Sequence, residues 1–375
     1  MVDVSVIIPS LNEEKSIRIC IEKVKKVFRE YNMDGEIIVS DNSTDRTPEI
    51  ARSLGAKVIT PDKRGYGYAY LYALKYARGK YIIIGDADNT YDFLEIPKLL
   101  EPLKKGEADL VIGSRFKGKI LPGAMPWLHK YIGNPILTWF LNVFFKAGVS
   151  DAHSGFRAFT REALEKIKLR CHGMEFASEM IIEAVRRGLR IKEVPITYYP
   201  REGESKLSSF RDGWRHLKFM LLQTPKHLYY IPGFFMFIFG LSLVILMNLT
   251  TVRIGHVVLG VNSIIAGSLL AIVGYQVIFL GLFSSIYGHS KGYLELDRLT
   301  RFISERISLE KGATIGLAVF IAGFLYALSL IIKWIQSGFK ELPEVNQSIL
   351  GLTLLVIGLQ TIFFSFFLSM LGEEF

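Results

Sequence analysis

The sequence predicts an α/β domain with a mostly parallel sheet, followed by an all-α domain of four membrane-spanning helices. Over roughly the first 230 of the 375 residues, short apolar runs rich in β-branched residues alternate with helical patterns. Such alternation is typical of a parallel sheet covered by helices on both faces. Four long apolar segments follow, and a helix of about 20 apolar residues is long enough to cross a bilayer.

In the N-terminal half we expect five strands and four helices in alternation. The strands are expected at 4–8, 36–40, 57–60, 81–85 and 110–113. The helices are expected near 13–30, 46–54, 67–78 and 95–104. Ligands of such sheets bind beyond the carboxyl ends of the strands. The residues that follow each strand are therefore the first candidates for a binding site.

The C-terminal half is expected to cross the membrane four times, at 232–249, 257–283, 313–335 and 348–371. The connection 287–312 carries five Lys and Arg residues, whereas the other two connections carry one each. The positive-inside rule therefore places 287–312 in the cytoplasm, together with the N-terminal domain and both termini.

Two shorter apolar stretches are too polar to span. Segment 127–146 contains His129, Lys130 and Pro135, and segment 208–222 alternates apolar with basic residues. Both are expected to lie as amphipathic helices in the plane of the membrane interface. The expected organisation is a cytoplasmic domain with the interfacial helix 127–146, an interfacial helix with a linker, and a membrane domain, at 1–207, 208–231 and 232–375.

Charge and cysteine content exclude several classes of protein. The formal net charge is +9, and a basic membrane protein usually faces anionic headgroups or phosphorylated ligands. No basic-aromatic motif indicates a nucleic-acid partner. Cys20 and Cys171 are the two cysteines, with no CxxC pair and no His/Cys cluster, which argues against a disulfide framework or a zinc site.

Two aspartates directly follow the fourth expected strand. Asp86 and Asp88 stand two apart, and in an extended segment such residues project to the same side. They can share one hard divalent cation, which donor phosphates and water would complete. Such a metal neutralises charge on a departing nucleoside diphosphate. A lone pair of this kind is more often an acidic surface turn, but its place at a strand end favours the metal site.

Polar residues also follow the second and third strands. Asp41 is placed to contact a base or ribose, whereas Asp45 is expected to cap the following helix. The run Arg64-Gly65-Tyr66-Gly67 opens another helix. Glycines allow close approach of the backbone to a ligand, and a helix N-terminus favours phosphate.

Six motifs occur in order along the chain, namely VIIPSLNEE (6–14), DNSTD (41–45), DAD (86–88), GSR (113–115), DAHSGFR (151–157) and REGESK (201–206). Together they resemble family 2 glycosyltransferases of the polyprenyl-phosphate sugar synthase type, such as dolichyl-phosphate mannose and glucose synthases. The resemblance covers about residues 1–230. It implies a GT-A fold with a Rossmann-like sheet, and a metal-dependent, inverting transfer.

The resemblance also implies roles for the donor side of the site. Asp86 and Asp88 would hold Mg²⁺ or Mn²⁺. The residues that would contact the nucleotide-sugar donor are Pro9, Glu13, Asp41, Arg64, Asp86 and Ser205. Ser205 and Lys206 would lie on a loop that closes over the donor diphosphate. Asp88, Arg115 and Lys206 would be the catalytic residues.

On the acceptor side, the resemblance implies that Arg115 binds the lipid phosphate together with a basic residue of the first interfacial helix. His129 or Lys130 occupies that place. Arg157 is expected either to meet the phosphate or to brace its loop, and Asp151 to hold the same loop.

Three further side chains have two interpretations each. Glu175 and Glu179 stand four apart on one face of an expected helix. They could reach the sugar or the metal, or they could form a solvated face or brace Arg157. His153 could be a metal ligand, although a lone histidine is more often a hydrogen-bonded structural residue.

The expected reaction transfers a hexose from a nucleotide sugar to polyprenyl or dolichyl phosphate, with UDP-glucose favoured over GDP-mannose. A phosphate monoester has its second pKa near 6, so its oxygen is a nucleophile at neutral pH without a catalytic base. One alternative is a processive membrane polysaccharide synthase, but those enzymes carry a QxxRW motif that this sequence lacks. The other is a non-catalytic lipid-sugar flippase or scaffold. Anchoring and assembly of a homo-oligomer are the simplest roles for the four helices.

Overall fold

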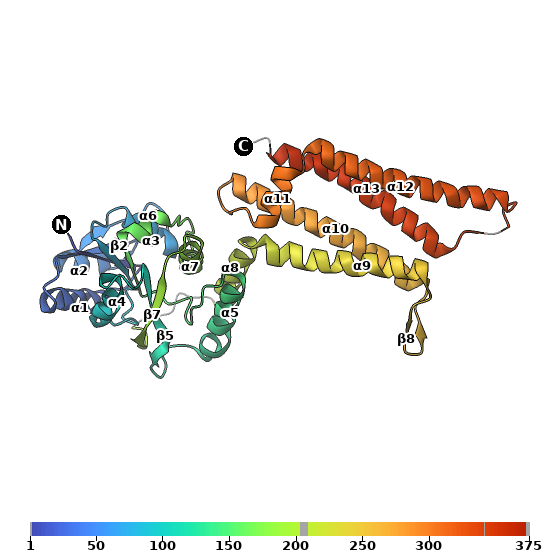
Figure 1. Cartoon of the computed structure of the whole chain (residues 1–375). Coiled ribbons are helices and arrows are strands. Elements are labelled where there is room, and N and C mark those ends of the chain that lie inside the picture. The colour runs from blue at the N-terminus through green and yellow to red at the C-terminus, as the bar shows by residue number, and fades with distance from the viewer. Residues whose placement is uncertain (1, 203–208, 341, 373–375) are drawn as a thin grey trace. The chain divides into compact units, whose positions relative to one another are not determined.

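The computed structural model describes residues 2–202, 209–340 and 342–372, and it gives only the backbone of Ser209, Phe210, Ile254, Val257 and Gly372. The chain divides into two compact units, residues 1–220 and 221–375. The first unit is α/β, and the second is almost entirely helical (Figure 1).

Among the described residues, the first unit is built on a seven-stranded sheet in the order β3-β2-β1-β4-β6-β5-β7. The strands are β1 (Val4–Ser10), β2 (Gly35–Asp41), β3 (Lys57–Ile59), β4 (Tyr81–Ile84), β5 (Leu110–Ile120), β6 (Arg157–Thr160) and β7 (Ile191–Tyr198). All neighbours pair in parallel except β6, which is antiparallel to both β4 and β5. The five predicted strands are confirmed, whereas β6 and β7 were not predicted.

Helices cover both faces of this sheet. They are α1 (Ile17–Glu30), α2 (Thr47–Ser53), α3 (Tyr66–Leu74), α4 (Ile96–Lys104), α5 (Asn134–Phe145), α6 (Arg161–Lys166), α7 (Phe176–Arg186) and α8 (Ser209–Leu222). Short helical turns precede α4 at Phe93–Glu95 and α5 at His129–Gly133. The helix predicted over 127–146 is thus confirmed as a π-turn that continues into α5.

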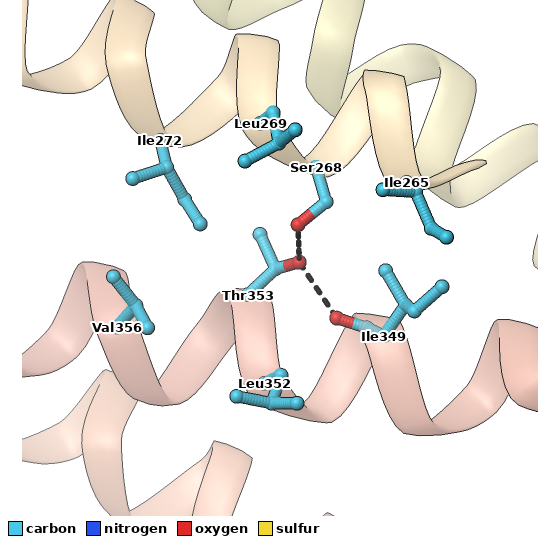
Figure 2. Close-up of a pocket in the computed structure, with 8 residues that line it drawn as sticks. All are labelled: Ile265, Ser268, Leu269, Ile272, Ile349, Leu352, Thr353 and Val356. Carbon is cyan, nitrogen blue, oxygen red and sulfur yellow. Dashed lines mark hydrogen bonds between the residues drawn. The ribbon is translucent and has the colours of Figure 1, made fainter. Parts of the chain in front are cut away.

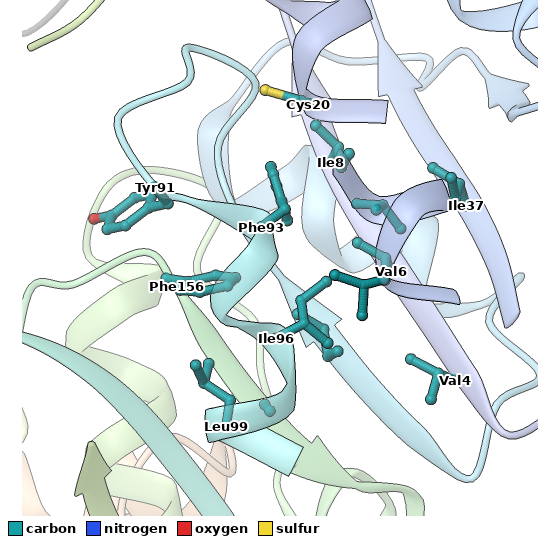
Figure 3. Close-up of a cluster of buried hydrophobic side chains, with 14 of the residues drawn as sticks. Val4, Val6, Ile8, Cys20, Ile37, Tyr91, Phe93, Ile96, Leu99 and Phe156 are labelled. Atoms are coloured by element: carbon teal, nitrogen blue, oxygen red, sulfur yellow. The ribbon is translucent and has the colours of Figure 1, made fainter. Parts of the chain in front are cut away.

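The alternation of side chains along β1 explains the two cores. Val4, Val6 and Ile8 are fully buried against α1 and α4, together with Phe93 (Figure 3). Ile7 points to the opposite face and packs in the cluster that contains residues of α3 and α7. A strand buried on both faces carries a continuous apolar run, because successive side chains point to opposite faces.

The second unit contains four helices, among the described residues, that are long and apolar enough to cross a membrane. They are α9 (Ile231–Leu249), α10 (Val261–Ser290), α12 (Leu309–Gln336) and α13 (Val345–Gly372). A short π-turn (Lys226–Tyr230) precedes α9, a two-stranded hairpin (β8, Arg253–Ile254; β9, Val257–Val258) follows it, and α11 (Arg298–Arg306) joins α10 to α12. The four predicted spans are confirmed.

Small residues and hydroxyl groups join these helices. Glycines allow α9 and α10 to approach closely, because a Cβ at Gly240 would lie 2.4 Å from both Gly267 O and Ala271 N. Between α10 and α13, the Ser268 and Thr353 hydroxyl oxygens lie 2.7 Å apart at an apolar pocket (Figure 2). Thr353 donates to its own helix at Ile349 O, so Ser268 is the donor of the interhelical bond. Both features are typical of packing between membrane helices.

Gly240→Ala is expected to destabilise the second unit by about 1–3 kcal/mol, because the added methyl group overpacks the α9–α10 contact. The measurement is thermal unfolding of the full-length protein in detergent. Gly351→Ala is the matched control, since its Cβ would meet only the Tyr326 and Ala327 side chains and the Ala327 Cα, at 3.3–3.9 Å. Equal melting temperatures for the two variants would contradict this account of the helix contact.

Candidate active site

The parallel strands deliver acidic residues to one edge of the sheet. Asp41 is the last residue of β2, Glu13 follows β1, and Asp86 and Asp88 follow β4. The register aligns Ile7 of β1 with Ile38 and Ile84, so the three strands end side by side. These residues lie at the edge where the sequence predicts that ligands bind.

Asp88 is buried, with 6% of its surface exposed. Its Oδ1 accepts hydrogen bonds from the Thr90 N–H at 3.1 Å and the Thr90 hydroxyl at 2.6 Å. Its Oδ2 lies 3.3 Å from Nη2 of Arg201, and the same nitrogen lies 3.2 Å from Glu13 Oε1. Asp88 Oδ2 thus already faces a positive charge. A hard metal ion bound to this oxygen would take the same place.

Asp86 has different surroundings. Its Oδ1 accepts hydrogen bonds from the hydroxyls of Tyr66 at 3.0 Å and Tyr70 at 3.1 Å. A Cβ at Gly155 would lie 2.7 Å from Asp86 Oδ2, so a side chain at that position would displace the Asp86 carboxylate. Burial raises the pKa of Asp86 to about 6, and the charge of Asp88 adds to the rise. The two aspartates are therefore close together, but each is held by its own partners.

A metal would need ligands from outside the protein. Within residues 2–202, 209–340 and 342–372, no group of three or more His, Cys, Asp or Glu side chains could hold a metal ion. The carboxylate oxygens of Asp88 and Asp86 suit a hard divalent cation, which takes phosphate and water oxygens as its other ligands. The residues present therefore fit a metal that arrives with a phosphorylated donor.

Three other residues predicted to contact the donor, Asp41, Pro9 and Arg64, lie in β2, in β1 and just before α3, with different exposure. Asp41 is 2% exposed and accepts the Ser10 hydroxyl at 2.6 Å and the Ser43 N–H at 3.1 Å. Pro9 lies half-buried in β1, and Arg64 is exposed just before α3.

Asp45 accepts the N–H of Thr47 at 3.0 Å, at the start of α2. This bond confirms the structural role that was predicted for Asp45.

The glycines at the start of α3 accommodate the chain's own backbone. A Cβ at Gly67 would lie 2.2 Å from Cys171 O, and one at Gly65 would lie 2.5 Å from His172 O. The His172 carbonyl also accepts the N–H of Tyr68 at 3.1 Å. The N-terminus of α3, which was predicted to favour phosphate, is therefore partly occupied by residues 171–173.

Glu179 holds that same segment in place. Its carboxylate accepts the backbone N–H groups of Arg170 at 2.9 Å and Cys171 at 2.8 Å. Glu179 is thus a brace, but for the backbone of residues 170 and 171 and not for Arg157. Glu175 carries a buried Oε2 that lacks a hydrogen-bond partner among the described residues.

Arg115 forms a buried ion pair with Asp151. Its Nε and Nη2 donate to the two carboxylate oxygens at 2.8 and 2.7 Å, and its backbone N–H donates to Asp151 as well. Burial alone would lower the pKa of Arg115, but Asp151 holds it well above its usual value. The guanidinium group lies over the ring of Tyr198, with 5.2 Å to the centroid. Arg115 is thus a fixed cation at a defined place.

His129 is the first residue of the π-turn. Burial lowers the pKa of His129, the charge of Arg115 lowers it further, and Asp212 of α8 opposes these effects. The ammonium group of Lys130 instead lies over the exposed Tyr131 ring, at 5.2 Å from its centroid. Of the two basic residues predicted on this helix, His129 is therefore the one associated with Arg115.

His153 belongs to a buried polar chain that joins α7 and α8. The Ser178 hydroxyl lies 2.8 Å from His216 Nδ1 and 3.5 Å from His153 Nε2. Burial lowers the pKa of His216 to about 4, and that of His153 well below its usual value. The structural interpretation of His153 is therefore the one that the contacts favour.

Arg157 was a candidate ligand of the acceptor phosphate as well as a candidate brace, and the contacts correct the first of these two roles. It is 1% exposed, and its three side-chain nitrogens donate to the carbonyl groups of Ser154, Ala177 and Ala152 at 2.7–2.9 Å. With all three nitrogens engaged by backbone, Arg157 braces the 152–157 loop and is not available to a phosphate.

Ser205 and Lys206 lie outside the described residues. Sequence reasoning also missed some contributors to the site, namely Tyr66, Tyr70, Thr90 and Arg201. Two signals were present in the sequence: the tyrosines stand four apart on one helix face, and Arg201 opens the REGESK motif.

Comparison with known proteins identifies the family. The sequence model of the family described as Glycosyl transferase family 2 matches residues 5–168, and that of Glycosyltransferase family 2 C-terminal transmembrane region matches residues 282–372. The chain is 50% identical over 369 residues to the low-salt glycan biosynthesis hexosyltransferase Agl6 of Haloferax volcanii, which covers 98% of this chain and 89% of that relative. The chain belongs to glycosyltransferase family 2.

Two further similarities agree with this family 2 membership. The chain is 35% identical over 215 residues to a dolichyl-phosphate hexose transferase of H. volcanii, covering 56% of this chain and 89% of the relative. A mycobacterial protein of known crystal structure is 22% identical, covers 59% of this chain and 74% of its own, and has a TM-score of 0.50, a likeness of fold alone. The protein is thus a glycosyltransferase with the predicted GT-A fold, and an integral membrane protein.

Asp151→Asn is expected to destabilise this glycosyltransferase by about 3–5 kcal/mol, because it leaves Arg115 buried without its counter-charge. The loss of stability is measured by thermal or denaturant unfolding of the full-length protein, followed with a signal that reports on the first unit. Asp109→Asn, which breaks the exposed pair with Arg190, is the matched control and should cost about 1 kcal/mol or less. Equal costs would show that Arg115 does not depend on Asp151.

Proposed function

We propose that the protein transfers a hexose from a nucleotide sugar to polyprenyl or dolichyl phosphate, with inversion at the sugar carbon. One observation carries this proposal. Tyr198 adjoins both halves of the site: its ring is under Arg115, and its backbone pairs with that of Tyr91, in the segment that follows Asp88. A cation for an acceptor phosphate and a carboxylate for a donor-bound metal thus share one neighbour.

On the donor side, Asp88 and Asp86 would hold Mg²⁺ or Mn²⁺, which would neutralise charge on the departing nucleoside diphosphate. The tyrosine hydroxyls at Asp86 fix the orientation of its carboxylate before the donor arrives. Glu13 and Asp41 offer buried carboxylates to the nucleoside. Lys206, outside the described residues, is proposed to bind the diphosphate.

On the acceptor side, the protein has to hold the acceptor phosphate next to the donor diphosphate, although both are anions. Arg115 is fixed by Asp151 and Tyr198, so little side-chain entropy is lost when it binds a phosphate. The acceptor oxygen is already deprotonated near neutral pH, and no proton has to be removed by the protein. Alignment and electrostatic stabilisation then supply much of the rate.

The lipid nature of the acceptor is supported by the exposed face of the first unit. Trp127, Trp139 and Trp214 are each more than half exposed, on the α5 helical run and on α8. The opposite sides of these helices pack in one buried cluster with Leu141 and Met220. Exposed tryptophans on amphipathic helices are typical of membrane-interface anchors. We propose that this face lies in the cytoplasmic interface, next to the lipid phosphate.

The choice of donor rests on the sequence and the relatives. UDP-glucose is the donor that we favour, and GDP-mannose is the second candidate. The similar proteins are a hexosyltransferase and a dolichyl-phosphate hexose transferase by name, which supports a hexose and a lipid phosphate.

His129→Ala is expected to raise KM for polyprenyl phosphate by about tenfold with little change in kcat, because it removes one phosphate contact beside Arg115. Lys130→Ala is the matched control on the same helix and should change KM by less than about threefold. Initial rates at varied acceptor concentration give both constants. A larger effect of Lys130→Ala on KM would show that Lys130, and not His129, contacts the acceptor phosphate.

The decisive experiment incubates purified full-length protein with a panel of nucleotide sugars and dolichyl or undecaprenyl phosphate, and identifies the lipid product by mass. A lipid that carries one hexose supports the proposal, and a polymer supports the polysaccharide synthase. Asp88→Ala should lower kcat/KM by at least about a thousandfold with divalent metal present. Full activity of Asp86→Ala or Asp88→Ala would refute the metal site, and transport without donor hydrolysis would favour a flippase.

A further inference from the structure

Arg201 joins two buried carboxylates that come from distant parts of the chain. Its Nη2 lies 3.2 Å from Glu13 Oε1 and 3.3 Å from Asp88 Oδ2. Glu13 is 8% exposed and Asp88 is 6% exposed. Thr90 already binds Asp88 Oδ1, so the oxygen that faces Arg201 is the one that remains for a cation. Arg201 therefore lies at the place proposed for the metal.

The backbone around Arg201 is fixed to the segment that carries Asp88. The N–H of Tyr199 donates to Thr90 O at 2.9 Å, and the N–H of Glu202 donates to Asp88 O at 3.3 Å. The Asn89 amide adds a bond of 2.9 Å to the Glu202 carboxylate. Arg201 is thus placed by the same strand-end segment that it neutralises, and its contact with Asp88 is built into the fold.

The side chain of Arg201 is only partly hydrogen-bonded, through the bond from its Nη2 to Glu13 Oε1. Its Nε is buried and has no hydrogen-bond partner in the part of the chain that the structure describes. A buried N–H without a partner carries a free-energy cost. In Arg157, by contrast, each of the three nitrogens donates to a backbone carbonyl. Arg201 can leave Asp88 at a smaller cost than a fully bonded arginine.

We propose that Arg201 is a resident counter-cation, which neutralises Asp88 and Glu13 in the nucleotide-free protein and leaves Asp88 when the donor brings the metal. The inference rests on the proposed function, since it assumes that Asp88 takes the metal. Two buried carboxylates beside Asp86 repel one another unless a cation lies between them. A guanidinium group and a divalent ion cannot both occupy the space at Asp88 Oδ2, because their charges repel at that distance.

This exchange has a consequence for the order of binding. A free metal ion has to displace Arg201 without help, so its affinity for the nucleotide-free protein is low. A metal that arrives with a nucleoside diphosphate brings additional contacts that offset the displacement. Metal and nucleotide are then coupled, and each raises the affinity of the site for the other by the same factor.

The test measures Mn²⁺ binding to the nucleotide-free, full-length protein in detergent by electron paramagnetic resonance. Arg201→Gln should lower the Kd for Mn²⁺ by about tenfold, because the competing charge is gone. Arg201→Lys keeps a cation and should stay within about threefold of the wild type. Arg190→Gln is the matched control. It makes the same change in net charge at the exposed ion pair with Asp109, and it should leave the Kd for Mn²⁺ unchanged.

A second set of measurements locates the effect. With saturating UDP, the wild type and Arg201→Gln should bind Mn²⁺ within about threefold of each other, so the coupling shrinks in the variant. The double variant Arg201→Gln, Asp88→Ala should lose the gain in Mn²⁺ affinity. The inference is overturned if Arg201→Gln and Arg190→Gln both match the wild type without nucleotide, if the gain survives without Asp88, or if Arg201→Gln weakens only UDP binding. Failure of the proposed function would appear separately, as absence of a metal-dependent lipid product.

Discussion

The carboxylates buried at the carboxyl edge of the sheet are the constraint on which the rest of the site depends. Parallel strands β1, β2 and β4 end together, and each is followed by an acidic residue. Burial of several carboxylates in one place is unfavourable unless cations and hydrogen-bond donors match them. The structure meets this need in three ways, with hydroxyls at Asp86 and Asp41, with Thr90 at Asp88, and with the guanidinium group of Arg201.

The site as a whole is a line of alternating charges. Glu13, Arg201 and Asp88 form its proposed donor end, and Arg115 with Asp151 forms its proposed acceptor end, with Tyr198 next to Arg115 and paired with Tyr91 in the segment after Asp88. Both proposed substrates are anions at the atoms that react. A site that already contains fixed charges of both signs needs little reorganisation when two phosphorylated ligands arrive, and such preorganisation is a major source of rate enhancement.

The sequence predicted the parts of this arrangement that depend on local pattern. The five strands, the four membrane helices and the pair Asp86 and Asp88 follow from periodicity and from position at strand ends. β6 was missed because its sequence, Arg157–Thr160, lacks the apolar run that marks the equally short β4. Its antiparallel direction depends on pairing with β4 and β5, which are distant in sequence. Long-range contacts of this kind also decide between the two roles of Arg157, because three backbone carbonyls satisfy it only after the 152–157 loop and α7 have packed.

A second chain of contacts connects Asp86 to α7, a helix that supplies neither of the two proposed metal ligands. Glu179 of α7 holds the backbone at Arg170 and Cys171, and the carbonyl groups of residues 171 and 172 pack against Gly67 and Gly65 at the start of α3. That start fixes Tyr66 and Tyr70, whose hydroxyls orient Asp86. Glu179 of α7 therefore contributes to the proposed metal site through the positions of other groups. A carboxylate that looks like a ligand in the sequence can be part of the site without touching the metal, and its replacement would displace Asp86 instead of removing a metal bond.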